Sequence, residues 1–203
     1  MEKPKSCLAR LILISKKNKI IKKKKPVAKK KKTVQSTIGG LYSKYDDYMT
    51  PDWVWKDLQP VIPKNKVIWE PFYGDGTSGK ALEKLGFEVI HEDIDFFNED
   101  KGDVIISNPP FSKKIEIFKR LKKLGKPFII VCPSFSLNRR YVQHLFENET
   151  ENPLQIMIPS KRINFIKTEN GKPVENFKSD SNFECFYYCW KINLPNAIVW
   201  AKQ

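Results

Sequence analysis

Two apolar runs that each end in a polar turn constrain the fold of this chain more than any other feature. Residues 67–69 (Val-Ile-Trp) run into a glycine-rich turn, and residues 104–106 (Val-Ile-Ile) run into the turn Ser-Asn-Pro-Pro-Phe. A helical pattern resumes after each turn, which is typical of an α/β fold with parallel strands. Ligands of open α/β sheets bind beyond the carboxyl ends of the strands. The two turns therefore predict one shared pocket.

The first turn, residues 70–79, reads Glu-Pro-Phe-Tyr-Gly-Asp-Gly-Thr-Ser-Gly. Its glycines, Gly74, Gly76 and Gly79, would let the backbone approach a ligand closely, and the following helix would offer free N–H groups. Turns of this kind also occur where nothing binds. The glycine-rich turn alone does not assign a site.

The second turn carries the sharper chemical signal. Pro109 and Pro110 fix two φ angles and remove two backbone donors, so the carbonyls beside Asn108 have little freedom. An amide side chain, a rigid carbonyl and the ring of Phe111 then converge at one strand end. This combination suits a planar amine that donates two hydrogen bonds while a ring stacks on it. A plain proline-rich turn is the alternative interpretation.

Together the two turns resemble those of the amino-methyltransferases that use S-adenosylmethionine. Glu-Pro-x-x-Gly-x-Gly followed by Asn-Pro-Pro-Phe is most similar to the DNA adenine-N6 methyltransferases, in the motif order that places a Thr-Pro segment first. That segment is present as Thr50-Pro51, and the resemblance spans about residues 45–190. It implies a Rossmann-like class I methyltransferase fold, with a mostly parallel central sheet and an antiparallel C-terminal strand.

The resemblance also implies a role for each motif residue. The catalytic turn would be Asn108, Pro109, Pro110 and Phe111, and Phe111 and Phe165 would stack on the target base. S-adenosylmethionine would be the cofactor, and it would contact a larger set of residues: Thr50, Pro51, Glu70, Pro71, Tyr73, Gly74, Gly76, Asp93, Asp95 and Phe96. On local grounds alone, Thr50 is the N-cap of a helix over 52–58, and a lone phenylalanine such as Phe165 is more often part of a core.

Acidic residues follow the second predicted strand, residues 87–91. A carboxylate at this strand end suits two adjacent ribose hydroxyls, and either Asp93 or Asp95 could take that role. A solvated acidic turn is the alternative. About eight residues separate this turn from the next strand, where the family usually fits another helix and strand. The sequence therefore predicts a shortened sheet edge, which leaves the choice between Asp93 and Asp95 open.

The remaining elements follow from apolar periodicity. We expect a helix over 78–85 ended by Gly86, and an amphipathic helix over 113–124. A buried strand over 128–132 and a helix over 138–146 come next. The last two strands, 155–158 and 183–192, are expected to pair antiparallel.

Basic charge is concentrated in the first residues of the chain. The formal net charge is +14, and residues 1–32 hold 14 Lys/Arg and one Glu, which leaves the body nearly neutral. We expect residues 1–36 to form a disordered tail and residues 37–203 a single methyltransferase domain. Such a tail suits phosphate binding with a steep salt dependence or a nuclear localisation signal, and a merely solubilising tail is the alternative.

Several function classes are disfavoured by what the sequence lacks. No metal pattern is formed by Cys7, Cys132, Cys185 and Cys189, which are expected to be reduced thiols in an intracellular, non-secreted protein without a membrane span. His91 and His144 are isolated.

DNA is favoured over RNA as the partner, with target specificity built from loops or supplied by a protein partner. Structured-RNA adenine methylation, protein-glutamine methylation and an inactive nucleic-acid-binding partner are the alternatives.

Overall fold

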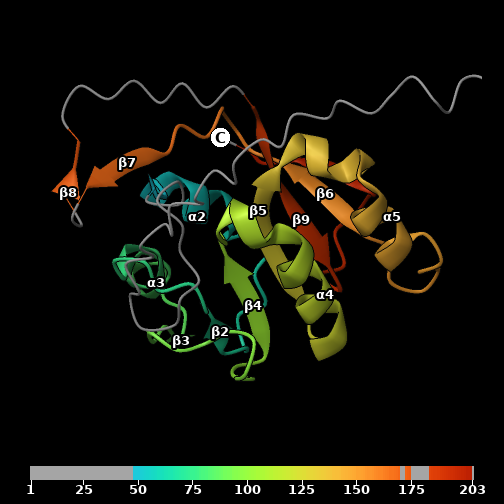
Figure 1. Cartoon of the computed structure of the whole chain (residues 1–203), viewed down its shortest axis with the longest axis horizontal. Helices are drawn as coiled ribbons and strands as arrows, with labels where there is room; N and C mark the ends of the chain where they lie inside the picture. The colour runs from blue at the N-terminus through green and yellow to red at the C-terminus, as the bar shows by residue number, and fades with distance from the viewer. Residues whose placement is uncertain (1–47, 170–171, 175–182, 203) are drawn as a thin grey trace, which may run out of the picture. The chain divides into compact units, whose positions relative to one another are not determined.

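The computed structural model describes residues 48–169, 172–174 and 183–202, all within a unit that spans residues 34–203. A seven-stranded sheet in the order β10-β6-β9-β5-β4-β2-β3 organises this unit (Figure 1). All neighbouring strands are parallel except β9, which runs antiparallel to β5 and to β6. The expected basic tail, residues 1–36, lies outside the described residues.

The strands of the sheet are short and mostly buried. Their bounds are β2 (Ile68–Trp69), β3 (Val89–Ile90), β4 (Val104–Ser107), β5 (Phe128–Pro133), β6 (Gln155–Ile158), β9 (Cys185–Trp190) and β10 (Ile198–Trp200). Alternate residues of the central strands enter two different cores: Val104 and Ile106 lie in one, and Ile105 lies in the other. Burial on both faces explains why these strands read as continuous apolar runs.

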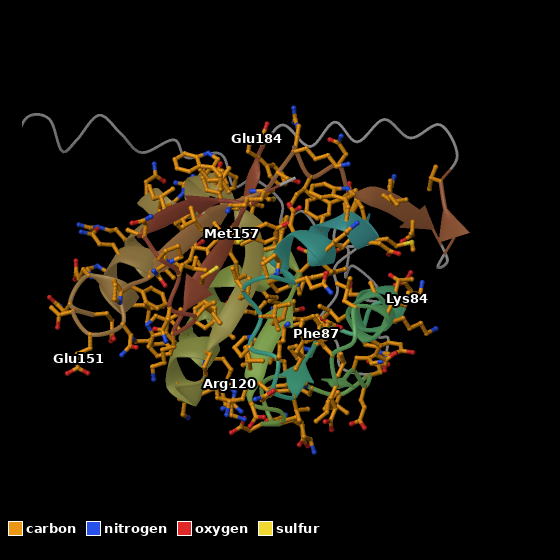
Figure 2. The ribbon with its side chains drawn as sticks, turned by 180° about the vertical axis from the view of Figure 1, so that it is seen from behind. Lys84, Phe87, Arg120, Glu151, Met157 and Glu184 are labelled. Carbon is orange, nitrogen blue, oxygen red and sulfur yellow. The ribbon has the colours of Figure 1, made fainter. Side chains whose placement is uncertain are left out.

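Helices cover both faces of the sheet. Helices α2 (Asp52–Leu58) and α3 (Thr77–Lys84) pack on one face, whereas α4 (Lys114–Leu124) and α5 (Arg140–Phe146) pack on the other. Figure 1 shows α4 and α5 in front of the sheet, and Figure 2, seen from behind, shows the α2 side with Met157 labelled. The arrangement is a doubly wound, Rossmann-like α/β fold, as the sequence predicted.

A second, antiparallel sheet links the start of the described chain to a later segment. It consists of β1 (Tyr48–Met49), β7 (Ile166–Glu169) and β8 (Lys172–Pro173), in the order β1-β7-β8. Met49 lies opposite Ile166, so Thr50 and Phe165 leave this sheet from the same end. This pairing places two sequence-distant candidate residues side by side.

Most predicted elements are confirmed, with small changes at their ends. The helix over 52–58 has the predicted bounds, and β9 is antiparallel to β6 as expected. Short 3-10 turns, Phe111–Lys113 and Ser134–Asn138, precede α4 and α5, so both helices begin slightly later than the predicted starts at 113 and 138. Gly86 follows α3 with a φ of 90°, as its role in ending that helix requires.

Two expectations about the elements were wrong or incomplete, and a third is confirmed. Pro51, not Thr50, is the N-cap of α2, and no side chain among the described residues caps this helix. Strand β10 was not predicted, and it extends the sheet beyond β6 through parallel pairing. The shortened opposite edge is confirmed, because the two-residue β3 ends the sheet beside β2.

Candidate active site at the ends of β2 and β4

The two polar turns meet because β2 and β4 are adjacent parallel strands. Trp69 lies opposite Ile105, so Glu70 and Ser107 come together at the carboxyl ends of the strands. The Ser107 hydroxyl donates a short hydrogen bond to Glu70 Oε1, which also accepts from the backbone N–H of Phe72 at 3.2 Å. The two turns for which the sequence predicted one shared pocket are therefore directly linked by a hydrogen bond.

Glu70 is a buried carboxyl group with an incomplete set of partners. It is 1% exposed, and its Oε2 atom has no hydrogen-bond partner among the described residues. Desolvation raises the pKa of Glu70 from 4.5 to about 7, although the bonds from Ser107 and Phe72 oppose the shift. The carboxyl group is therefore poised to gain or lose a proton near neutral pH, and Oε2 can serve a ligand donor.

The glycine-rich turn is held by contacts that larger residues would break. Gly76 has a φ of 77°, and a Cβ there would lie 2.8 Å from the Tyr73 hydroxyl. The Tyr73 ring stacks on His91 at 5.9 Å between centroids. At Gly79, a Cβ would overlap the His91 ring. Tyr73 and His91 thus form a preformed wall behind the turn.

Helix α3 begins directly from this turn. Asp75 accepts hydrogen bonds from the backbone N–H of Thr77 at 3.0 Å and from the Thr77 hydroxyl at 2.6 Å. The acid lies at the positive end of the helix dipole, where it stabilises the first turn. Local side-chain chemistry therefore fixes the orientation in which the turn meets the helix.

Asn108 is held in place by a residue far away in the sequence. Its Nδ2 atom donates to the Thr50 hydroxyl at 2.9 Å, and Thr50 is 5% exposed. Its Oδ1 atom is buried and has no hydrogen-bond partner among the described residues. Pro109 and Pro110 that follow are both buried. Thr50 thus satisfies one end of the amide and leaves the acceptor end unused.

An unused buried acceptor is costly, so it points to a ligand. Leaving such a group without a partner costs about 1–3 kcal/mol, which a bound N–H donor would recover. The amide oxygen lies in the turn that also carries Phe111, so a flat donor could bond to the amide and stack on the ring. The arrangement is suited to hold an amino or amide nitrogen.

Phe111 lies in a group of aromatic rings. It meets Phe165 edge to face, with centroids 5.9 Å apart and an interplanar angle of 76°, and it meets Phe183 at 5.9 Å and 67°. Lys114 donates to the Phe111 carbonyl at 3.0 Å. Phe165 is only 6% exposed and belongs to the core on the α2 side. The two predicted base-stacking rings are therefore in contact, and Phe165 is the more deeply buried of the two.

The acids after β3 differ in how they are engaged. Asp95 accepts from the backbone N–H of Phe97 at 2.9 Å and from Asn98 Nδ2 at 2.7 Å, so it closes its own turn. Asp93 is exposed, and its carboxylate has no partner among the residues that the structure describes. Asp93 is therefore the acid with both oxygens available to a ligand.

Phe96 is placed differently from the expected site residue. Its side chain is fully buried in the core on the α4 side, where it packs on Trp69 and on Phe72 at centroid distances of 5.5 and 4.9 Å. It offers no exposed face to a cofactor ring in this structure. A hydrophobic residue beside an acid reads the same in sequence whether it faces the core or a pocket.

Other residues at the site were not assigned a role from the sequence. Ser107 immediately precedes the Asn-Pro-Pro-Phe turn, and that position was the available signal for its bond to Glu70. His91 was interpreted as isolated, but it backs the glycine-rich turn and its Nε2 lies 3.2 Å from Glu83 Oε1. No sequence signal pointed to Phe183, because its contact with Phe111 spans distant segments.

The described part of the chain contains no candidate metal site and no helix suited to span a membrane. Within residues 48–169, 172–174 and 183–202, no three His, Cys, Asp or Glu side chains are grouped to hold a metal ion. Cys132, Cys185 and Cys189 are free and buried, as expected for reduced thiols, whereas Cys7 lies outside the described residues. Among the helices that the structure describes, none has the length and apolar character needed to cross a membrane.

Comparisons with known proteins give limited information. No family model and no curated protein matches the chain. Among solved structures, the chain is similar to a candidate class I S-adenosylmethionine-dependent methyltransferase from Listeria monocytogenes. That likeness has 12% sequence identity and a TM-score of 0.45, and it covers 78% of this chain and 67% of the other.

Proposed function

We propose that this protein is an S-adenosylmethionine-dependent methyltransferase that modifies the N6 amine of adenine in nucleic acid, with DNA as the favoured polymer. The observation that carries the proposal is the buried Oδ1 of Asn108, which has no hydrogen-bond partner among the described residues and lies in the turn that also holds Phe111. The resemblance of both turns to those of the adenine-N6 methyltransferases supports it. So does the bond that joins the turns through Ser107 and Glu70.

The chemistry of the target amine explains why these residues suit the reaction. The lone pair of the exocyclic amine is delocalised into the adenine ring, so the nitrogen is a poor nucleophile. Asn108 Oδ1 and the Pro109 carbonyl would accept its two N–H groups and favour a pyramidal nitrogen. Phe111 would fix the plane of the base. Catalysis then consists mainly of positioning, with no strong base required before positive charge develops on the nitrogen.

The residues around the glycine-rich turn fit the cofactor. Bound S-adenosylmethionine would supply an electrophilic methyl group attached to a sulfonium. Glu70 Oε2, which is buried and unpartnered among the described residues, gives the site an unused acceptor on the strand-end side. Thr50-Pro51, Pro71, Tyr73, Gly74 and Gly76 would complete the contacts, and Asp93 would accept the ribose hydroxyls. Phe96 would support Phe72 from behind rather than touch the cofactor.

Two considerations bear on the polymer: the cost of exposing the target base, and the positive charge of residues 1–32. In duplex DNA the target must leave the stack, which costs a few kcal/mol and would be offset in part by stacking on Phe111. An unpaired base in RNA would avoid this cost. The basic residues 1–32 favour a polyanion over a protein substrate. The primary amide of a glutamine would also satisfy Asn108 Oδ1, so a protein substrate is the rival outcome.

The deciding experiment measures transfer of labelled methyl groups from S-adenosylmethionine. Duplex DNA, single-stranded DNA, structured RNA and a glutamine-containing peptide are tested in parallel, and the nucleosides are digested and identified by mass. We expect N6-methyladenine from a nucleic-acid substrate. Asn108→Ala should abolish transfer and leave cofactor affinity largely intact, whereas the matched variant of an exposed asparagine, Asn196→Ala, should behave like wild type.

Three results would overturn the assignment. Near-wild-type turnover by Asn108→Ala would show that the amide does not hold the reacting nitrogen. Label in the peptide alone would move the substrate class to protein, and no cofactor binding at all would favour an inactive methyltransferase-like fold.

A further inference from the structure

A row of aromatic rings continues outward from Phe111. Phe183 contacts Phe111 at 5.9 Å on one side and Phe135 at 5.9 Å on the other, with an interplanar angle of 86° to Phe135. The guanidinium of Arg139 lies 5.4 Å from the centroid of the Phe135 ring. Three rings and an arginine therefore extend from the proposed target-base position to the surface.

The outer end of this row is exposed although it is strongly apolar. Phe135 is 39% exposed, and Leu137 on the same 3-10 turn is 43% exposed. Between them, Ser136 is fully buried, and Cys132 Sγ donates to its hydroxyl at 3.4 Å. The turn is thus anchored through alternate residues, while Phe135 and Leu137 face outward.

The turn that carries Phe135 is rigidly joined to the segment that carries Phe183. The backbone N–H of Ser134 donates to the Glu184 carbonyl at 2.8 Å. The Tyr188 hydroxyl donates to the Pro133 carbonyl at 2.9 Å and lies 3.2 Å from the Ser134 carbonyl. Figure 2 labels Glu184 at the opposite end of the sheet from Phe87 and Arg120. The aromatic surface is preformed, so a ligand would not have to order it.

Charge around the rings favours an anionic ligand. Arg139 and Arg140 are exposed beside Phe135, and Lys114 lies against Phe111. Glu184, the acid next to Phe183, is paired with Arg162 at 3.4 Å. An aromatic face flanked by arginine and lysine suits a base with its phosphate, because bases stack on rings regardless of sequence and phosphates pair with arginine.

We infer that Phe135 and Arg139 form a stacking site for an unpaired nucleobase next to the target base. This inference rests on the proposed function and specifies its substrate, because a base inside an intact duplex already has both faces covered. A target base on Phe111 and a neighbour on Phe135 would be separated by the ring of Phe183. The protein should therefore prefer single-stranded or locally unpaired nucleic acid to a continuous duplex.

The test uses the full chain and short DNA strands that carry the fluorescent base 2-aminopurine. The probe replaces either the target adenine or one of the two nucleotides on each side, and each strand is measured alone and in a duplex. We expect strong quenching at the target and at one flanking position in the single strand. Phe135→Ala should remove the flanking signal and keep the signal at the target.

Affinity gives a second readout. One base–aromatic stack contributes enough that Phe135→Ala should weaken single-strand binding by about five- to a hundredfold. Phe135→Trp should restore binding, which a merely structural role for the phenylalanine would not predict. The control Trp200→Ala removes a 68% exposed aromatic from β10 and should have little effect. Arg139→Ala should weaken binding more than Arg140→Ala, whose guanidinium touches no ring in the described residues.

The outcomes separate this inference from the proposed reaction. Adenine methylation with unchanged affinity and flanking signal in folded Phe135→Ala overturns the stacking site alone. Loss of affinity in Phe135→Ala without any adenine methylation retains the stacking site and overturns the reaction. An absence of nucleic-acid binding by the wild-type chain overturns both.

Discussion

The hydroxyl of Thr50 accepts a hydrogen bond from the side-chain amide of Asn108 at 2.9 Å, across 58 positions of the sequence. This bond joins the residue that precedes Pro51, the N-cap of α2, to the turn after β4. An asparagine amide has two ends of opposite character, and the bond assigns the donor end to Thr50. The acceptor end, which has no partner among the described residues, thereby faces the proposed substrate, so Thr50 is expected to act as a positioning residue.

Thr50→Val should impair turnover because it removes the acceptor for Asn108 Nδ2 and keeps the side-chain shape. A hydrogen bond of this kind is worth about 0.5–1.5 kcal/mol, which corresponds to a loss in kcat of about two- to thirteenfold. Steady-state kinetics should show the loss in kcat, with the KM for S-adenosylmethionine changed less. Thr50→Ser keeps the hydroxyl and should retain most activity, and equal activity of the Val and Ser variants would contradict the positioning role.

Glu70→Gln should change how stability depends on pH. The pKa of Glu70 is raised to about 7 in the folded protein, so the folded state binds the proton more tightly than the unfolded state. Stability from this group is therefore complete below about pH 4.5 and is lost as the pH rises through 7, a change on the order of 3 kcal/mol. Glutamine does not titrate, so denaturant unfolding of the variant should lose less stability between pH 5 and 8.

A matched control for Glu70→Gln is Glu88→Gln, which changes an exposed carboxylate directly before β3. Its stability should follow the wild-type pH profile. Parallel profiles for wild type and Glu70→Gln would show that Glu70 does not titrate in this range.

Gly79→Ala should destabilise the protein even though it lies inside α3. Alanine favours a helix over glycine by about 1 kcal/mol, but a Cβ at this position would overlap the ring of His91 and lie 2.6 Å from its Cβ. Overpacking of this kind costs about 1–3 kcal/mol, which should outweigh the gain in helix propensity. Thermal melts should show a lower Tm, and cofactor affinity should fall because Tyr73 is stacked on the displaced histidine.

The double variant Gly79→Ala/His91→Ala separates the clash from other effects. Removing the imidazole should make the alanine at 79 less costly than it is in the wild-type background. Independent, additive losses would mean that the two residues do not press on each other.

Deletion of residues 1–33 should weaken nucleic-acid binding without removing cofactor affinity. These residues carry almost all of the net charge of the chain, so they are expected to contact phosphates. Each such contact steepens the fall of log K with log salt concentration by about 0.9. Affinities measured from low to high salt should give a flatter line for the shortened chain. An unchanged slope would show that the basic segment does not bind phosphate.

Strand positions and strand-end chemistry were accessible from the sequence because they depend on local patterns. The apolar runs that became β4 and β5 are buried on both faces, and the turn after β4 contains the predicted Asn-Pro-Pro-Phe residues. The shortened edge followed from counting the residues between Phe96 and Asp103. Each of these inferences used residues that are close together in the chain.

The features that the sequence did not reveal depend on contacts between distant segments. Threonine is a common residue type at helix N-caps, but the Thr50 hydroxyl instead accepts a hydrogen bond from the Asn108 side chain. Phe96 and Phe135 are both phenylalanines beside polar residues, yet one is fully buried and the other is 39% exposed. Strand β10 has only three residues and was too short to recognise without β6 beside it.

Strand β9 lies between β5 and β6 although it comes after both in the chain. Until residues 185–190 have emerged from the ribosome, β5 has no neighbour on that side and the sheet is divided into two parts. Pairing of this strand closes long loops, which slows folding. The turns after β2 and β4 therefore rest on an incomplete sheet until β9 pairs, and the site between them should form only after residues 185–190 have joined the sheet.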